Sequence, residues 1–143
     1  MLFRSVQIWD VATGATLTVL SGHSRSVAGI SFSPDGRFLL STSLDKSLRV
    51  WDAELGEQKG LLKVAGMSSA CFSPDGKYIA FGTRKGLVRM CRTDNLHGCS
   101  MAEFTEHIYN VEHVAFSPSG EFLVSADWLG IVYMRPLTKL LEH

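Results

Sequence analysis

Residues 22–52 of the chain read GHSRSVAGISFSPDGRFLLSTSLDKSLRVWD. This stretch holds three short runs in which apolar and polar residues alternate, at 27–32, 37–43 and 48–52. Such alternation is typical of β-strands that bury one face. Residues 33–36 (SPDG) form a turn signal between the first two runs, because proline presets φ early in a turn and glycine accepts a positive φ. The stretch therefore predicts three strands joined by tight turns.

The rest of the chain repeats this stretch. Pro34, Pro74 and Pro118 are spaced by about 40 residues, and each follows a phenylalanine by two positions. The chain opens inside a repeat, because residues 6–10 (VQIWD) match residues 48–52 (LRVWD). A period of about 40 residues with four short strands per unit predicts an all-β propeller.

Composition narrows the class of protein. The chain has 143 residues, of which 45% are hydrophobic and 20% charged, so it can build a packed core. Lys+Arg and Asp+Glu both number 14, and this balance lacks the basic excess typical of a nucleic-acid-binding surface. No apolar run reaches the length of a membrane span, about 18 residues. We therefore expect neither nucleic acid nor membrane among the partners.

Cysteine usage and the N-terminal sequence predict the compartment. The first residues, MLFRSVQIWD, lack the apolar centre of a signal peptide. The chain has three cysteines, an odd number, which fits a reducing compartment better than a disulfide framework. We expect a cytoplasmic or nuclear protein.

The Gly-His pair, the Ser-Pro-Asp-Gly turns, the Trp-Asp ends and the period resemble the WD-repeat (WD40) β-propeller family, and the resemblance covers essentially the whole chain. It implies that each repeat supplies the outer strand of one four-stranded antiparallel blade and the inner three strands of the next. The chain then forms a single partial propeller of about three and a half blades. Its expected parts are an incomplete blade at 1–20, a first blade at 21–62, a second at 63–106 and a third at 107–143.

The C-terminal end of this partial propeller carries two further expectations. A fourth strand of the last blade is expected within residues 137–141, and residues 141–143 (LEH) have the composition of a vector-derived tag. Family rings hold about four to eight blades, so we expect oligomerisation or further chain to complete this one.

The resemblance also implies a hydrogen-bonded network inside a blade, formed by His23, Ser41, Asp45 and Trp51. A His-Ser-Asp set invites a hydrolase interpretation. We interpret the set as structural, because these groups would be buried between strands. The equivalent residues of the second repeat are Lys63, Phe81, Lys85 and Cys91, and those of the third are His107, Ser125, Leu129 and Arg135. We expect both repeats to have lost the network, either by drift or by reshaping for a partner.

No catalytic residue, metal site or cofactor is predicted. Cys91, His97, Cys99 and His107 are candidate zinc ligands, but the spacing lacks the close pair that is usual in zinc sites. The sequence contains neither a P-loop nor a dinucleotide-binding fingerprint.

Family members often bind peptides or protein segments on the face whose loops enter the inner strands and join the second strands to the third. The resemblance places on this loop face Ser26, Ala28, Leu44, Gly66, Ser68, Arg84, Tyr109, Asn110, Glu112 and Trp128. Trp, Tyr and Arg dominate the energetics of protein interfaces. For Trp128, a partner contact and packing over a neighbouring blade both remain open.

Three functions follow from these observations. The first, which we favour, is a non-enzymatic scaffold that binds a protein or peptide partner on the loop face. The second is a self-assembling half-propeller whose homodimer closes one ring. The third is a hydrolase or metal-dependent enzyme built on the His-Ser-Asp or Cys-His residues.

Overall fold

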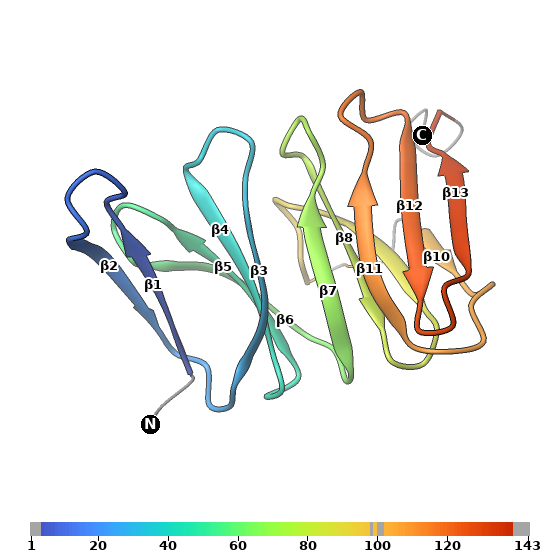
Figure 1. Ribbon diagram of the computed structural model, residues 1–143, viewed down its shortest axis with the longest axis horizontal. Coiled ribbons are helices and arrows are strands. Elements are labelled where there is room, and N and C mark those ends of the chain that lie inside the picture. Colours follow the sequence, from blue (N-terminus) through green and yellow to red (C-terminus); the bar gives the residue numbers. More distant parts are fainter. Residues whose placement is uncertain (1–3, 98, 100–101, 139–143) are drawn as a thin grey trace.

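The computed structural model describes residues 4–97, 99 and 102–138, and the regular structure of these residues is β-strand only (Figure 1). Their strands form four antiparallel sheets. The N-terminal pair comprises β1 (Ser5–Trp9) and β2 (Thr16–Ser21). The first blade comprises β3 (Val27–Phe32), β4 (Phe38–Ser43), β5 (Ser47–Asp52) and β6 (Gln58–Lys63).

The remaining strands form two further sheets. The second blade comprises β7 (Met67–Phe72), β8 (Tyr78–Thr83), β9 (Val88–Arg92) and β10 (Ala102–Phe104). The third comprises β11 (Val111–Phe116), β12 (Phe122–Asp127) and β13 (Val132–Pro136). The prediction of an all-β partial propeller is confirmed. Of the fourth strand expected within 137–141, residues 139–141 lie outside the described part of the chain, as do the tag-like residues 141–143.

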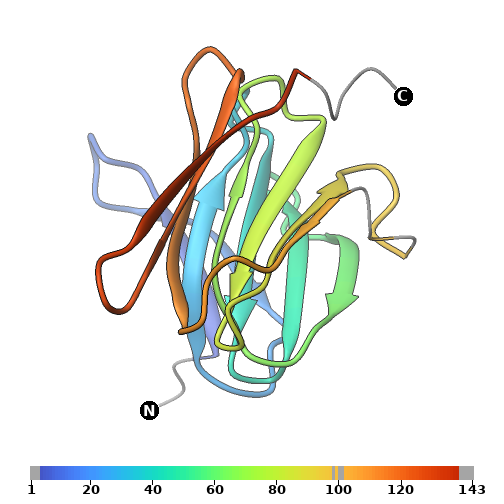
Figure 2. The same ribbon diagram turned by 90° about the vertical axis from the view of Figure 1, so that its right-hand side faces the viewer.

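The sheets are meanders that stack in a row. The strand order is β3-β4-β5-β6 in the first blade and β10-β9-β8-β7 in the second, so each strand pairs with its neighbours in sequence. Figure 2 looks along the row and shows the sheets one behind another. The described residues include no helix with the length and apolarity needed to cross a membrane.

The recurring turns have a common hydrogen-bond design. In the first blade, Ser33 Oγ donates to Asp35 at 2.6 Å and accepts from the backbone N–H of Phe38 at 2.8 Å. In the second, Ser73 makes the same bonds to Asp75 and Tyr78 at 2.6 and 3.0 Å. The last residue of each turn is a glycine with φ between 71° and 74°, namely Gly36, Gly76 and Gly120. The sequence signal at 33–36 therefore acts through side-chain bonds and a left-handed glycine.

Three apolar clusters lie between successive sheets. The first joins the N-terminal pair to the first blade and contains Val6, Leu20, Leu39 and Trp51. The second joins the first and second blades, where Leu40, Leu48, Ile79 and Phe81 are fully buried. The third joins the second and third blades and includes Val88, Met90, Val111, Leu123 and Leu137. Each blade thus buries its apolar residues against the next blade.

The two ends of the row leave apolar surface exposed. On the N-terminal pair, Trp9 is 58% and Leu17 62% exposed, and on β13 Val132 is 59% and Met134 65% exposed. Because the N-terminal pair has only two strands, part of β3 is also uncovered, and its Ile30 is 59% exposed.

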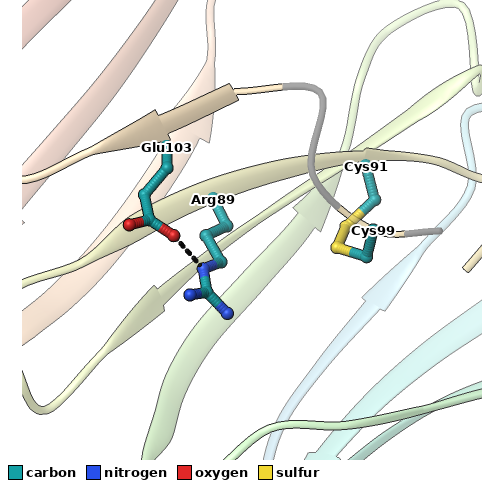
Figure 3. The surroundings of a disulfide bond; sticks show 4 residues. All are labelled: Arg89, Cys91, Cys99 and Glu103. Carbon is teal, nitrogen blue, oxygen red and sulfur yellow. Dashed lines mark hydrogen bonds and ion pairs between the residues drawn. A yellow bond between two sulfur atoms is a disulfide. The ribbon is translucent and has the colours of Figure 1, made fainter. Parts of the chain in front are cut away.

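The outer part of the second blade carries a disulfide and an ion pair (Figure 3). Cys91 on β9 is bonded to Cys99, with a separation of 4.9 Å between their Cα atoms. The prediction of reduced cysteines is therefore wrong for this pair, because the segment after β9 returns to the strand it has just left. Cys71 is a free thiol, and burial raises its pKa to about 11. Arg89 and Glu103, opposite each other on β9 and β10, form an ion pair at 2.5 Å.

Candidate functional site

The first blade contains a chain of hydrogen bonds among the four residues named from its sequence. Trp51 Nε1 donates to Ser41 Oγ at 2.8 Å, and Ser41 Oγ lies 2.7 Å from His23 Nε2. His23 Nδ1 lies 2.9 Å from Asp45 Oδ2. Because an indole N–H can only donate, the Ser41 hydroxyl accepts from Trp51 and donates to Nε2. This direction leaves the Nδ1–H of His23 to donate to Asp45.

The protonation states fit this direction. Burial lowers the pKa of His23 and outweighs the opposing effect of Asp45, so the ring is neutral. Burial alone would raise the pKa of Asp45, but bonds from Ser47, His23 and the backbone N–H of Ser24 hold that pKa well below its usual range. Since Ser41 is fully buried, its hydroxyl cannot reach a substrate. The arrangement holds strands together and leaves no exposed nucleophile.

The third blade has a network as well, which corrects the expectation that the network was lost. His107 Nδ1 lies 3.1 Å from Asp127 Oδ2, and His107 Nε2 lies 2.8 Å from Ser125 Oγ. The acid is Asp127, not the residue at the Leu129 position. Ser125 and Asp127 are two residues apart on β12, so their side chains share one face of the strand. That alternation was the sequence signal for Asp127.

In the third-blade network, Arg135 is the donor to the serine hydroxyl, as Trp51 is in the first blade. Its Nη1 donates to Ser125 Oγ at 2.8 Å, while its Nη2 is paired with Glu106 Oε2 at 2.9 Å. The guanidinium also lies over the rings of Phe104 and Tyr133, at 4.7 and 5.3 Å from their centroids. The Arg135 hydrogen bond holds the pKa of Glu106 below its usual range. A charged donor has thus replaced a neutral one, together with its own counterion.

In the second blade, the four positions that form the network in the first blade hold other residue types. Phe81 is fully buried in the apolar cluster, Cys91 is in the disulfide, and Lys63 and Lys85 are exposed. Of the candidate zinc ligands, Cys91 and Cys99 are bonded to each other in the disulfide, and His107 belongs to the third-blade network. No group of three or more possible metal ligands converges among the described residues.

The loop face lies at the lower edge of Figure 1, and one backbone hydrogen bond recurs on it in every blade. Leu44 N donates to Ser26 O at 3.0 Å, Arg84 N to Gly66 O at 2.8 Å, and Trp128 N to Asn110 O at 3.0 Å. Each bond ties the turn between the second and third strands to the loop that enters the inner strand. The structure therefore brings together these three pairs of residues named from the sequence.

The other residues named for this face differ in their surroundings. Tyr109 is 46% and Trp128 71% exposed, so the blades that the structure describes leave most of the Trp128 side chain uncovered. Ser26, Ala28 and Glu112 are exposed. The hydroxyl of Ser68, in contrast, donates to Gly82 O and to Val111 O, and so joins the second blade to the third.

A hollow of about 340 Å³ opens between the first and second blades on this face. Its lining comprises Arg25, Ser43, Leu44, Lys46, Gly66, Met67 and Arg84. Sequence reasoning had placed Leu44, Gly66 and Arg84 on the face but missed Arg25 and Lys46. Both lie within two residues of a predicted position, and a scan for charge along the same loops would have found them.

Four-stranded meanders stacked face to face, with a His-Ser-Asp network within the blade, define the class as a β-propeller of the WD type. The family model described as "WD domain, G-beta repeat" matches residues 14–52 and 98–134. The chain belongs to the WD-repeat family.

Relatives of this chain come from several organisms. It is 30% identical over 134 residues to autophagy-related protein 16 of Arabidopsis thaliana. The alignment covers 90% of this chain and 26% of that relative. It is 32% identical over 107 residues to transcription initiation factor TFIID subunit 5 of Caenorhabditis elegans, covering 69% of this chain and 16% of the relative. WD repeat-containing protein SL1-17 of Schistosoma mansoni is 30% identical to this chain over 128 residues. The alignment covers 88% of this chain and 42% of that relative. The chain thus spans less than half the length of each.

Proposed function

We propose that the chain is a non-catalytic protein-interaction scaffold that binds a peptide or protein segment on its loop face, in the cytoplasm or nucleus. The observation that carries this proposal is the set of exposed apolar side chains on the turns of the third blade. Trp128 and Leu129 are 71% and 57% exposed, and Ile108 and Tyr109 are 84% and 46% exposed. The hydrogen bond from Trp128 N to Asn110 O joins the two turns that carry them.

The large exposed aromatic and apolar side chains of this cluster are of the kind found in binding surfaces. Large aromatic side chains bury much area at a small cost in conformational entropy, and they are enriched among the residues that dominate binding energy. The relatives support a scaffold in general terms, because one is named as a subunit of a transcription initiation factor. Their names belong to different processes, and we assign the chain to none of them.

The test is selection of peptides from a random library displayed on phage, followed by affinity measurements with synthetic peptides. Trp128→Ala should weaken binding by about 10-fold or more, which is typical when an interface tryptophan is truncated. The melting temperature should be unchanged, because the side chain is 71% exposed. Trp9→Ala is the matched control, since Trp9 is 58% exposed on the N-terminal pair.

Two outcomes would contradict this proposal. The first is that every selected peptide binds the Trp128→Ala variant as well as the native chain. The second is that Trp9→Ala and Trp128→Ala weaken binding equally, since the effect would then not belong to the loop face.

A second candidate function is self-assembly into a closed ring, and the uncovered faces at the two ends of the row favour it. Trp9 and Leu17 at one end, and Val132 and Met134 at the other, expose apolar surface of the kind that blades bury against each other. In a two-fold pair, each end would cover the other end of the second copy.

The test of self-assembly is molar mass by light scattering across a dilution series. A dimer near twice 15.7 kDa that dissociates in the Met134→Lys variant would support closure by two copies. A monomer at all concentrations would contradict it, and repeats of a longer chain would then be the candidates to cover these faces.

A further inference from the structure

We infer that the hollow between the first and second blades receives an acidic side chain of the bound segment, so that the partner is an acidic peptide. This inference rests on the proposed function and names its partner class. Three of the seven lining residues, Arg25, Lys46 and Arg84, are cationic, and none is acidic. A concave site lined by one sign of charge attracts ligands of the opposite sign.

The three cations have no carboxylate partner in the described part of the chain. Elsewhere four cations have a carboxylate partner: Lys59 with Glu57, Arg89 with Glu103, Arg92 with Asp94 and Arg135 with Glu106. Asp45 is adjacent to Lys46 in sequence, but its carboxylate accepts bonds from His23, Ser47 and the Ser24 amide. Its carboxylate is thus held in the blade network and is not part of the lining, and the three cations give the hollow a net positive charge.

Lys46 adds an independent observation. It has φ 66° and is the only described residue other than glycine with a positive φ. At the same position in the next two blades stand Gly86 and Gly130, with φ 80° and 82°. A lysine in this left-handed conformation is strained where glycine is not. The chain therefore carries a cation in the lining of the hollow at a conformational cost, as residues with a binding role often do.

The cations are attached to a fixed backbone. Ser43 Oγ donates to Arg25 O at 3.0 Å, Val64 N to Lys46 O at 2.9 Å, and Arg84 N to Gly66 O at 2.8 Å. Leu44 and Met67 supply apolar lining between the charged groups. A glutamate or aspartate side chain fits this design, with its methylene groups against the apolar residues and its carboxylate beside the cations. Little backbone ordering would be needed on binding.

The experiment is fluorescence anisotropy of the full chain with a labelled Glu-Ser repeat peptide, with the matching Gln-Ser peptide as the uncharged probe. The Glu-Ser peptide should bind, and its affinity should fall as salt is raised, whereas the Gln-Ser peptide should bind at least about 10-fold more weakly. Arg84→Gln and Lys46→Gly should each weaken Glu-Ser binding by about 10-fold. Lys46→Gly should not lower the melting temperature, because glycine relieves the strain at this position, so its loss of binding cannot be ascribed to unfolding.

Lys77→Gln is the control for net charge, since Lys77 is exposed beside the Ser-Pro-Asp-Gly turn of the second blade, away from the hollow. Equal weakening by Lys77→Gln and Arg84→Gln would overturn the inference, as would equal binding of the two peptides. A phosphoserine peptide or a single-stranded oligonucleotide that binds more tightly than Glu-Ser and depends on Arg84 would overturn the choice of an acidic peptide. If selected peptides still depend on Trp128 while Glu-Ser does not bind, the hollow is excluded and the proposed function stands.

Discussion

The first and third blades build the same chain of hydrogen bonds from different residues. In both, a histidine links a carboxylate to a serine hydroxyl, and that hydroxyl accepts a further bond from β5 or β13. The last donor is Trp51 in the first blade and Arg135 in the third. The comparison shows that, where the network forms, the donor to the serine hydroxyl can be neutral or charged.

The residue that precedes the network histidine explains why one blade has tryptophan as the donor and the other has arginine. It is Gly22 in the first blade, where a Cβ would lie 2.5 Å from Nη1 of Arg49 and 3.1 Å from Cη2 of Trp51, so a side chain there would crowd both residues. It is Glu106 in the third, which pairs with Arg135. A buried guanidinium without a counterion is costly, so the glutamate and the arginine belong together.

The largest expected effect comes from transferring the charged donor alone. Trp51→Arg should lower the free energy of unfolding by about 3–5 kcal/mol, because it places a charge in the first blade without a carboxylate beside it. Arg49, which lies over the Trp51 ring, would add like-charge repulsion. Denaturant unfolding measures the effect.

The double variant Gly22→Glu/Trp51→Arg should recover part of this loss, although Gly22→Glu alone should destabilise by crowding the indole. A double-mutant cycle gives the coupling between the two sites. Zero coupling would mean that the pairing of Glu106 with Arg135 does not explain the exchange.

A smaller effect is expected from removing the acid. Asp45→Ala should destabilise by about 1–3 kcal/mol, because His23 and Ser47 lose a buried partner. Adding Ser43→Asp moves the carboxylate to the position that Asp127 holds in the third blade and should restore part of the stability. Chemical denaturation checks both variants. A change within about 0.5 kcal/mol for Asp45→Ala would show that the first-blade network contributes little.

The smallest effect is a pH dependence. The pKa of His23 is lowered below its usual value of 6.5, mainly by burial, so in the folded state the ring resists protonation. The neutral His23 ring therefore contributes its full stability above about pH 6.5. This contribution is lost as the pH falls from there toward the lowered pKa that His23 has in the folded state. The expected slope is at most about 1.4 kcal/mol per pH unit.

The unfolding midpoint measured between about pH 7.5 and pH 5 reports this slope. The slope should diminish in His23→Gln and persist in His113→Gln, because His113 is exposed. A slope that survives both substitutions would belong to other groups.

The sequence predicts the stacking of blades well and their interiors less well. The turn at 33–36 and its recurrences set the strands, because proline and glycine act locally. The network of the third blade was missed because the spacing between Ser41 and Asp45 leads from Ser125 to Leu129, whereas the acid is Asp127, the last residue of β12. The Cys91–Cys99 bond depends on how the segment after β9 returns, and no local pattern specifies that path. The hollow was missed for a similar reason, since its walls come from two blades.

The backbone hydrogen bond that recurs on the loop face has a consequence for protein engineering. It joins serine to leucine and asparagine to tryptophan through backbone atoms alone, at 3.0 Å in both, so the bond does not depend on which side chains stand at these four positions. A library that randomises 26, 44, 110 and 128 would vary the chemistry of the face while the turns keep their shape. The repeat could thus serve as a small framework for selecting new binding specificities.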